Sequence, residues 1–386
     1  MSVIIVGDPH IGAGVSIGKT GLGSNLNSRI ADQFNLLDFI FDQAVDNNST
    51  DLIITGDVFE DPKPSSQLIT MFISWLKKCA SYGVNVHIIT GNHDVLRSGN
   101  FYISPLDIIS ELELDNIFIY KSIDTLIIGT TAYTLVPFRD RKSLQCSTNN
   151  DAINIVGGLI KYELVGIPIT YTKILVGHLA IEGSIPIGDE LSDLNNELMC
   201  PINIFEGYDY VWMGHVHKPQ VMSKNPYVAH VGSMDISNFG ETEQKKHIII
   251  FDSNFDTIDL PTRKLKKINI IIPKDIKDTT KYVLDQLKDS YDNAILKVEL
   301  SLEDKELPSV DKLTIEKALL SKGAFNISSI SQSKKVNLIK KDNSVNNTMS
   351  PLSAINTYAH AHVDKDKRAK FIELSIEIFN SLNETN

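Results

Sequence analysis

The chain has 386 residues and 42% hydrophobic content, enough for one large domain and a smaller second one, each with its own core. Its formal charge of −11 argues against a freestanding basic DNA-binding protein, because backbone phosphates are normally met by clustered Lys and Arg. Residues 1–260 contain 16 basic and 31 acidic side chains, whereas residues 261–386 contain 21 and 17. An acidic first part is typical of a cation-loading domain, although a solubilising surface is the simpler interpretation of acidity alone.

The cysteines and the hydropathy exclude further classes of protein. Cys79, Cys146 and Cys200 are widely spaced and form no CxxC pair, so neither a disulfide framework nor a zinc knuckle is expected and we interpret them as reduced core residues. The start of the chain, MSVIIVGDPH, lacks a basic leader, and no apolar run approaches the ~18 residues that a membrane span needs. We therefore expect a soluble, cytoplasmic protein without a membrane partner.

Strand-like and helix-like segments alternate in the first part of the chain. Helical spacing of apolar residues covers 30–45 after a plausible N-cap at Ser28, and 68–79 after Ser65 and Ser66. Apolar runs of strand length occupy residues 3–6, 52–55, 84–90, 126–128, 174–176, 210–213 and 248–251. This alternation predicts an α/β core.

A second, smaller module is predicted after a boundary near Pro261. Its expected elements are strands at 268–272, 294–300 and 325–330 and helices at 277–288 and 310–320. Residues 340–349, rich in Asn, Lys and Ser, are typical of a linker, and a helical pattern follows Pro351. We therefore divide the chain into a catalytic domain (1–260), a capping domain (261–339), a linker (340–350) and a C-terminal helical segment (351–386). That segment either caps its own domain or docks on a partner.

Strand after strand in the first part ends in a residue of the kind that binds metals. The segments are Asp8-Pro9-His10, Gly56-Asp57, Gly91-Asn92-His93-Asp94, Gly177-His178 and Gly214-His215-Val216-His217. Because ligands bind beyond the carboxyl ends of strands in an α/β sheet, these five ends can converge on one place. Each segment alone has an ordinary structural explanation, such as a turn or a cap, but five in order along the chain favour a metal site.

The residue types favour two divalent transition ions. Asp, Asn and neutral His suit Mn²⁺ or Fe²⁺, whereas structural zinc would favour cysteine. A carboxylate shared by both ions would hold them roughly 3.5 to 4 Å apart, the separation that clamps the attacking and leaving oxygens of a phosphoryl group, and Asp57 is the natural bridge. We assign Asp8, His10, Asp57 and His217 to one ion and Asp57, Asn92, His178 and His215 to the other. The expected cofactor is two Mn²⁺ ions, with Fe²⁺ or Mg²⁺ as alternatives.

The ordered set DPH, GD, GNHD, GH and GHVH resembles the signature of the calcineurin-like metallophosphoesterases over about residues 3–241. Gly56-Asp57-Val58-Phe59 followed by Pro64-Ser65 is similar to the DNA repair nucleases of the SbcD family and to their phage, archaeal and eukaryotic relatives. Gly232-Ser233 followed by Phe239-Gly240-Glu241 and a strand is similar to them as well. In protein phosphatases of this superfamily, the second motif instead continues with an Asp and an Arg that this chain lacks.

The resemblance implies an α/β fold: a two-sheet β-sandwich flanked by helices, a small α/β capping domain, and a C-terminal segment that binds an SMC-like ATPase of the SbcC type. It implies a manganese-dependent DNA nuclease, exonucleolytic on double-stranded ends and endonucleolytic on single strands, acting in double-strand-break repair and recombination. A homodimer built on helices of the first domain is also implied. By the family's pattern, His93 is the catalytic histidine, which protonates the leaving oxygen or steadies the charged phosphorane, and Asp94 orients it. Glu60 stands where several members place a second active-site histidine and others an acid.

Two other functions stay open at this point. One is a stand-alone phosphatase or cyclic-nucleotide phosphodiesterase, and a capping module followed by a trailing helix argues against it. The other is a scaffold without catalysis that recruits the ATPase, and the full set of ligands argues against that.

Several weaker signals complete the prediction. Residues 13–20, AGVSIGKT, fit a loosened P-loop, but the preceding strand has already ended and no helix follows, so we interpret them as a loop in which Lys19 meets DNA phosphates. Arg263 and Lys264 belong to a basic run that is either a solvated face or a phosphate track. His230, just before Gly232-Ser233, is interpreted as structural.

Overall fold

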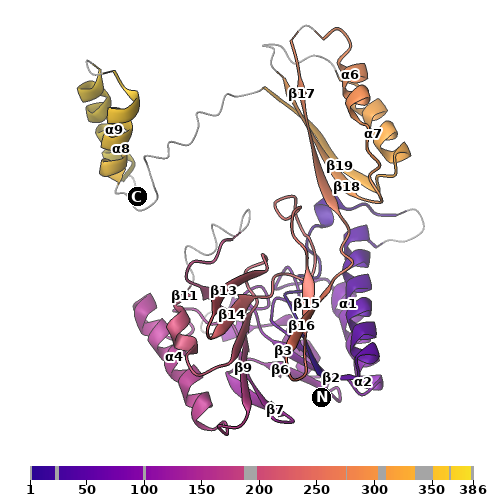
Figure 1. The fold of residues 1–386 in the computed structure, drawn as a ribbon, viewed down its shortest axis with the longest axis vertical. Coiled ribbons are helices and arrows are strands. Elements are labelled where there is room, and N and C mark those ends of the chain that lie inside the picture. The colour runs from indigo at the N-terminus through magenta and orange to yellow at the C-terminus, as the bar shows by residue number, and fades with distance from the viewer. Residues whose placement is uncertain are drawn as a thin grey trace.

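The fold is described from a computed structural model of the chain, which covers residues 2–21, 26–98, 101–186, 198–274, 276–302, 310–334, 351–364 and 367–383. Two six-stranded sheets pack face to face, with helices on the outer side of each (Figure 1). This arrangement confirms the predicted α/β sandwich.

The first sheet has the order β16-β15-β1-β2-β3-β6, and its strands β1, β2, β3 and β6 are parallel. Their bounds are β1 Ser2–Val6, β2 Ser49–Ile54, β3 Asn85–Ile89, β6 Ile117–Tyr120, β15 His247–Phe251 and β16 Phe255–Asp259. The second sheet has the order β13-β14-β12-β9-β8-β7, with β14, β12, β9 and β8 parallel. Its strands are β7 Asp124–Ile128, β8 Thr131–Val136, β9 Thr172–Gly177, β12 Tyr210–Met213, β13 Gln220–Lys224 and β14 Tyr227–His230.

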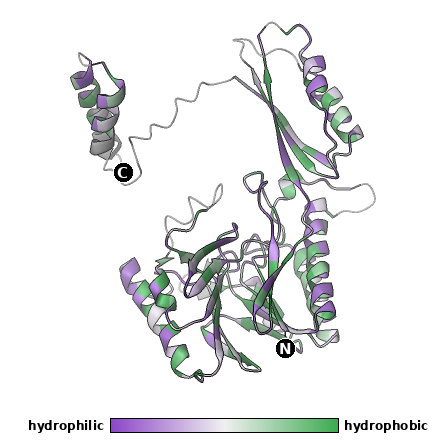
Figure 2. Ribbon diagram, viewed as in Figure 1, coloured by the Kyte–Doolittle hydropathy of each residue, from purple (hydrophilic) through white to green (hydrophobic). Residues whose placement is uncertain are grey.

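Alternation along the strands explains the layers. Val3 and Ile5 of β1 belong to the core between the sheets, which also contains Trp212 of β12. Ile4 and Val6 point the other way, into a core shared with helices α1 (Ser28–Asp46) and α2 (Ser66–Ser81). Because successive side chains of a strand face opposite sides of a sheet, a continuous apolar strand can bury both of its faces. Figure 2 shows that α1 carries both apolar and polar residues, as expected for a helix with one face on the core.

Some local details differ from the sequence prediction. The N-cap of α1 is Asn27, whose side chain accepts a hydrogen bond from the Arg29 amide, so the predicted N-cap at Ser28 was wrong by one residue. Ser65 caps α2 as predicted. The sequence did not predict α4 (Asn149–Val165), which covers the outer face of the second sheet and buries Val156 and Ile160 there.

Short elements connect these layers. They are η1 Val15–Ile17, β4 Leu96–Ser98, β5 Phe101–Ile103, α3 Pro105–Ser110, β10 Ala180–Ile181, β11 Met199–Cys200 and η2 Ile202–Phe205. Cys79 and Cys200 are free and buried, and burial raises the pKa of each thiol to about 12, whereas Cys146 is half-buried. The interpretation as core residues therefore holds for two of the three cysteines.

The chain beyond residue 261 forms a separate three-stranded parallel sheet with its own apolar core (Figure 1). Its elements are β17 Leu265–Ile272, α6 Thr279–Gln286, β18 Ile295–Leu302, α7 Lys312–Ser321 and β19 Asn326–Lys334. The predicted linker, residues 340–350, lies outside the described residues. Two helices, α8 (Pro351–His362) and α9 (Arg368–Asn383), follow in place of one continuous helical segment. Within the described residues, no helix is long and apolar enough to cross a membrane.

The small module meets the first domain beside η1 and α1. Arg263 forms an ion pair with Asp32 of α1, and its guanidinium lies 3.9 Å from the centre of the Phe325 ring. The Lys19 ammonium lies 4.1 Å from the same ring and donates a 2.8 Å hydrogen bond to the Phe325 carbonyl. Lys19 and Arg263 thus hold the two parts together, while the Lys264 side chain is exposed. Contact of these three residues with DNA stays a prediction.

Candidate metal centre

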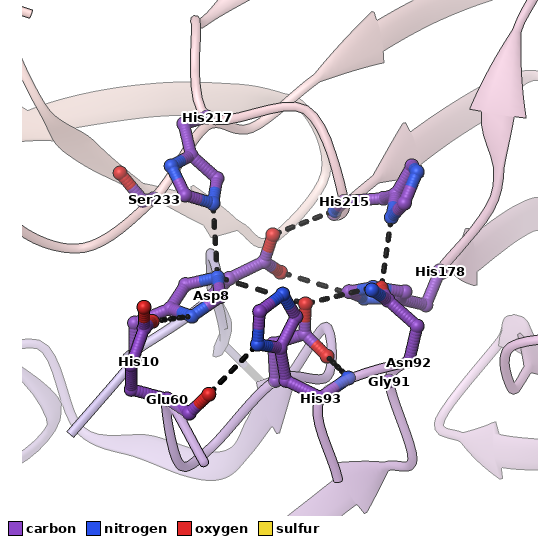
Figure 3. A network of polar contacts seen from close by, with 12 residues as sticks. Asp8, His10, Glu60, Gly91, Asn92, His93, His178, His215, His217 and Ser233 are labelled. Atoms are coloured by element: carbon purple, nitrogen blue, oxygen red, sulfur yellow. Dashed lines mark hydrogen bonds and ion pairs between the residues drawn. The ribbon is translucent and has the colours of Figure 1, made fainter. Parts of the chain in front are cut away.

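The seven predicted ligands come together at the carboxyl ends of five strands (Figure 3). β1, β2 and β3 of one sheet lead to Asp8 and His10, to Asp57 and to Asn92, whereas β9 and β12 of the other lead to His178 and to His215 and His217. Asp8 links the two sheets, because its carboxylate accepts hydrogen bonds from the Thr55 hydroxyl and from the His215 amide, each 2.6 Å long. The pocket therefore lies at the edge where both sheets end.

The backbone is constrained where the ligands converge. A Cβ atom on Gly91 would lie 2.0 Å from an Asp57 carboxylate oxygen, and one on Gly214 would lie 2.2 Å from an Asp8 oxygen. Only glycine allows the backbone to approach so closely. His10, Asp57 and His215 themselves have positive φ values of 42°, 47° and 78°, which non-glycine residues rarely adopt. Such strained residues cluster at functional sites.

The first group of ligand atoms comes from Asp8, His10 and Asp57, with His217 beside them. These side chains are almost completely buried, except that of His217, which is 16% exposed. The Nε2 atoms of His10 and His217 lie 2.9 Å apart, and His10 Nε2 lies 3.6 Å from Asp57 Oδ2. Two ring nitrogens that face each other beside buried carboxylates are suited to share a cation.

The second group consists of Asp57, His178 and His215, with Asn92 between the histidines. His178 Nε2 lies 3.1 Å from Asp57 Oδ2 and 2.8 Å from the Asn92 carbonyl oxygen, and His215 Nδ1 lies 2.9 Å from the same Asn92 oxygen. Asp57 thus takes part in both groups. The structure places the residues of the two proposed sets close together, and their oxygen and nitrogen donors fit a pair of divalent cations. His10, Glu60 and His93 form a third group of close donor atoms.

Charge explains why these groups can be buried together. Burial by itself would raise the pKa of Asp57, but the positive charges of neighbouring histidines, first His178, hold it far below its usual range. Burial would likewise lower the pKa of His178, but Asp57 and Asp8 raise it to about 10. Without a cation, a proton on His178 therefore neutralises part of the negative charge of the pocket.

We expect cation binding to release a proton at neutral pH. With its pKa raised to about 10, His178 is protonated at pH 7 in the metal-free protein, and a ligating histidine must be neutral. The affinity for Mn²⁺ should then rise with pH, by up to about tenfold per unit below pH 10. Calorimetry at pH 7 in two buffers with different ionisation enthalpies measures the protons released, and release of none would contradict this assignment.

His93 lies beside the cluster, and its ring orientation is set by a backbone group. Its Nδ1 donates a 2.8 Å hydrogen bond to the Glu60 carbonyl, and its ring packs edge-on against His10 with the centroids 4.9 Å apart. A carbonyl can only accept, so Nδ1 carries a proton and Nε2 is the atom that can exchange one with a substrate.

The role predicted for Asp94 needs correction. Its carboxylate accepts 2.9 Å hydrogen bonds from the amides of Val58 and Gly91, and it is completely buried. Burial and the charge of Asp57 raise its pKa to about 7. Asp94 therefore ties the turn after β2 to the turn after β3, and the Glu60 carbonyl, rather than Asp94, orients His93.

Glu60 contacts His10 and His93 at the more exposed side of the metal centre. Its carboxylate accepts a 2.8 Å hydrogen bond from His10 Nδ1, which leaves His10 Nε2 directed at Asp57 and His217. Although burial would raise the pKa of Glu60, the hydrogen bond with His10 lowers it below its usual value, so the side chain is ionised. A carboxylate on the outer nitrogen of a metal-ligating histidine fixes its tautomer and raises its basicity.

Loss of the Glu60 carboxylate should therefore weaken metal binding. We expect Glu60→Ala to lower the affinity for Mn²⁺ by roughly 10- to 100-fold, and Glu60→Gln, which can still accept from His10, to lower it less. The backbone bond to His93 is present in both variants. Asp61→Ala, an exposed neighbour, is the matched control for calorimetry with Mn²⁺. Equal affinities of the Ala and Gln variants and the unmodified protein would contradict a positioning role.

Two more residues near the site had no assigned role in the sequence analysis. Lys246 and Glu241 form a completely buried ion pair behind His217, and Lys246 also donates a 2.8 Å hydrogen bond to the His217 carbonyl. Burial would raise the pKa of Glu241, but His217 and Lys246 lower it to about 2.

His230 is buried as predicted, with Nδ1 donating to the Gly214 carbonyl, and burial lowers its pKa to about 4. These residues support the loop that carries His215 and His217.

A profile of the family described as Calcineurin-like phosphoesterase matches residues 1–219. This chain belongs to that family. As a calcineurin-like phosphoesterase, it is a metal-dependent phosphoester hydrolase, and its candidate ligands are those of the two groups above.

Similar solved structures include a dimetal phosphatase from Danio rerio, with 10% identity, a TM-score of 0.40, and coverage of 67% of this chain and 99% of that one. They also include a phosphopantetheinyl hydrolase from Mycobacterium tuberculosis, with 12% identity, a TM-score of 0.34 and coverage of 60% and 90%. A third is a cold-active protein-tyrosine phosphatase from a Shewanella species, with 13% identity, a TM-score of 0.29 and coverage of 66% and 80%.

Proposed function

We propose that this calcineurin-like phosphoesterase is a DNA nuclease of the SbcD type that uses two Mn²⁺ ions and works with an SMC-like ATPase in double-strand-break repair. The observation that carries the proposal is the second α/β module joined to the catalytic domain beside the η1 loop, at Arg263, Lys19 and Phe325. An excess of basic over acidic residues after residue 260 and the motif Gly56-Asp57-Val58-Phe59 support it.

The residues of the pocket can be assigned steps in the hydrolysis of a phosphodiester. Bound cations supply positive charge for the phosphoryl oxygens and an activated nucleophile. Asp57 holds the two ligand groups together, and Glu60 orients His10 within the first. His93, anchored at Nδ1, gives a proton from Nε2 to the oxygen that leaves phosphorus.

The proposal is tested with end-labelled linear duplex and single-stranded DNA, each with and without Mn²⁺. Bis(4-nitrophenyl) phosphate, a small diester without a base, measures the phosphodiesterase activity by itself. We expect manganese-dependent cleavage of both kinds of DNA. Hydrolysis of the small diester with duplex DNA left intact, even with the ATPase present, would instead favour a stand-alone phosphatase or cyclic-nucleotide phosphodiesterase.

The C-terminal helices are proposed to bind the ATPase. α8 and α9 follow the small module and pack on each other, with Tyr358 stacked on Phe371 at 6.1 Å. Phe371 and Leu374 stay 36% and 48% exposed, which leaves an apolar face for a partner. Removal of residues 350–386 should leave the intrinsic nuclease activity within about twofold and abolish co-purification with the ATPase. Unchanged complex formation would contradict this assignment.

A further inference from the structure

A second cavity, of about 300 Å³, lies beside the metal centre and has no role in the steps described so far. Thr90 and Phe138 form the wall nearest the metal ligands, and Val95, Lys121, Arg139 and Ser143 line the rest. Its volume is at the lower end of the range of small-ligand pockets, roughly 300 to 1,000 Å³. A cavity of this size can take one planar ring system with part of a sugar, and it is too small for a base pair.

Phe138 separates this cavity from the second group of metal ligands. Its ring lies parallel to that of His215 at 6.4 Å, with an interplanar angle of 30°, and edge-on to His178 at 6.3 Å. Its amide donates a 2.9 Å hydrogen bond to the carbonyl of Thr90, two residues before Asn92. Phe138 is therefore a wall shared by the metal centre and the cavity, and a ligand that occupies both lies across its ring.

The polar side of the cavity carries fixed positive charge in an otherwise acidic domain. The Arg139 guanidinium donates hydrogen bonds to the carbonyls of Phe138 and Lys121, at 2.8 and 2.6 Å, which holds it at the rim. The Lys121 ammonium forms an ion pair with Asp107, which also lines the cavity. Aromatic rings combined with cations are how proteins bind single-stranded nucleic acid, with bases on the rings and phosphates on the cations.

We infer that this cavity binds the base of the nucleotide next to the scissile phosphate, with its aromatic wall formed by Phe138 and the neighbouring phosphate facing Arg139. The inference rests on the proposed nuclease function, because it names the part of a nucleic acid that the site recognises besides the phosphodiester. Stacking on an aromatic ring tolerates all four bases. The base must leave its partner to enter, so a nucleotide is bound here in single-stranded form.

Binding of a ligand that cannot be hydrolysed tests the cavity without cleavage. The probe is the 5′-phosphonate of thymidine, whose carbon–phosphorus bond resists hydrolysis, compared with the same phosphonate lacking the base, in calorimetry with the full chain and Mn²⁺. We expect the base to strengthen binding roughly tenfold. Ser143→Phe, which fills the cavity, should reduce this ratio to about one while the base-free ligand binds as before.

Lys142→Ala is the matched control, because Lys142 is exposed next to the cavity and does not line it. Equal binding of the two phosphonates to the unmodified protein would overturn the inference. A base preference that persists in Ser143→Phe would also overturn it, provided that thermal unfolding shows this variant to be folded. If Ser143→Phe does not fold, the ratio of the two affinities is measured in Ser143→Leu. If the base strengthens binding but the protein does not cleave DNA, the proposed nuclease function is contradicted and the assignment of the cavity as a base-binding site is retained.

Discussion

Replacing His93 with alanine is expected to lower the rate of phosphodiester cleavage by roughly 10² to 10⁴ while the protein keeps its metal ions. The reason is that His93 contacts the cluster through its ring but is absent from both groups that share Asp57. Its Nδ1 is occupied by the Glu60 carbonyl, so its contribution is a proton at Nε2. Cleavage rates under saturating Mn²⁺ and the metal content by atomic emission measure the two effects separately.

His360→Ala is the control for this substitution, since His360 is an exposed histidine of α8. It should change neither quantity. If His93→Ala lost its bound metal, His93 would have to be counted among the ligands, together with Glu60 and His10, which lie near it.

Replacing Asp57 with asparagine is expected to remove both cations together. Asp57 is the one residue common to the two groups, and it is 1% exposed. Loss of a second-sphere partner costs roughly 10- to 100-fold in metal affinity, so the loss of a shared ligand should cost more than 100-fold. Metal titration followed by calorimetry should show two sites in the unmodified protein and neither in Asp57→Asn at the same concentrations.

Asp38→Asn removes an exposed carboxylate from α1 and is the matched control for the change in charge. It should bind both ions normally. One site that survives in Asp57→Asn with unchanged affinity would show that the two groups do not share this carboxylate.

Local sequence patterns predicted the second domain well and the peripheral helix α4 poorly. The five elements of the small module were predicted within four residues of their observed bounds, because each has an apolar period of its own. Helix α4 was missed. It contains Gly157 and Gly158, which are poor helix formers, and Leu159 and Tyr162 are 42% and 75% exposed, so its apolar residues do not form one clear face.

The position of the seven candidate ligands was predictable from the sequence because each lies in the turn that follows a strand. Parallel strands bring their carboxyl ends to one edge, so the order of the motifs was enough to place Asp8, Asp57 and His178 together. The partners of the neighbouring side chains were not predictable. His10 and Glu60 are 50 positions apart, so no local pattern links them.

The sequence by itself therefore determined the α/β sandwich, the calcineurin-like motifs and the set of ligands, since these depend on short-range periodicity and on the direction of strands. Only the tertiary structure decided that Glu60 holds both His10 and His93, that Asp94 binds backbone amides, and that Phe138 separates the metal centre from a second cavity. These contacts depend on the turns after different strands and on how the two sheets face each other. That packing is a property of the whole folded chain.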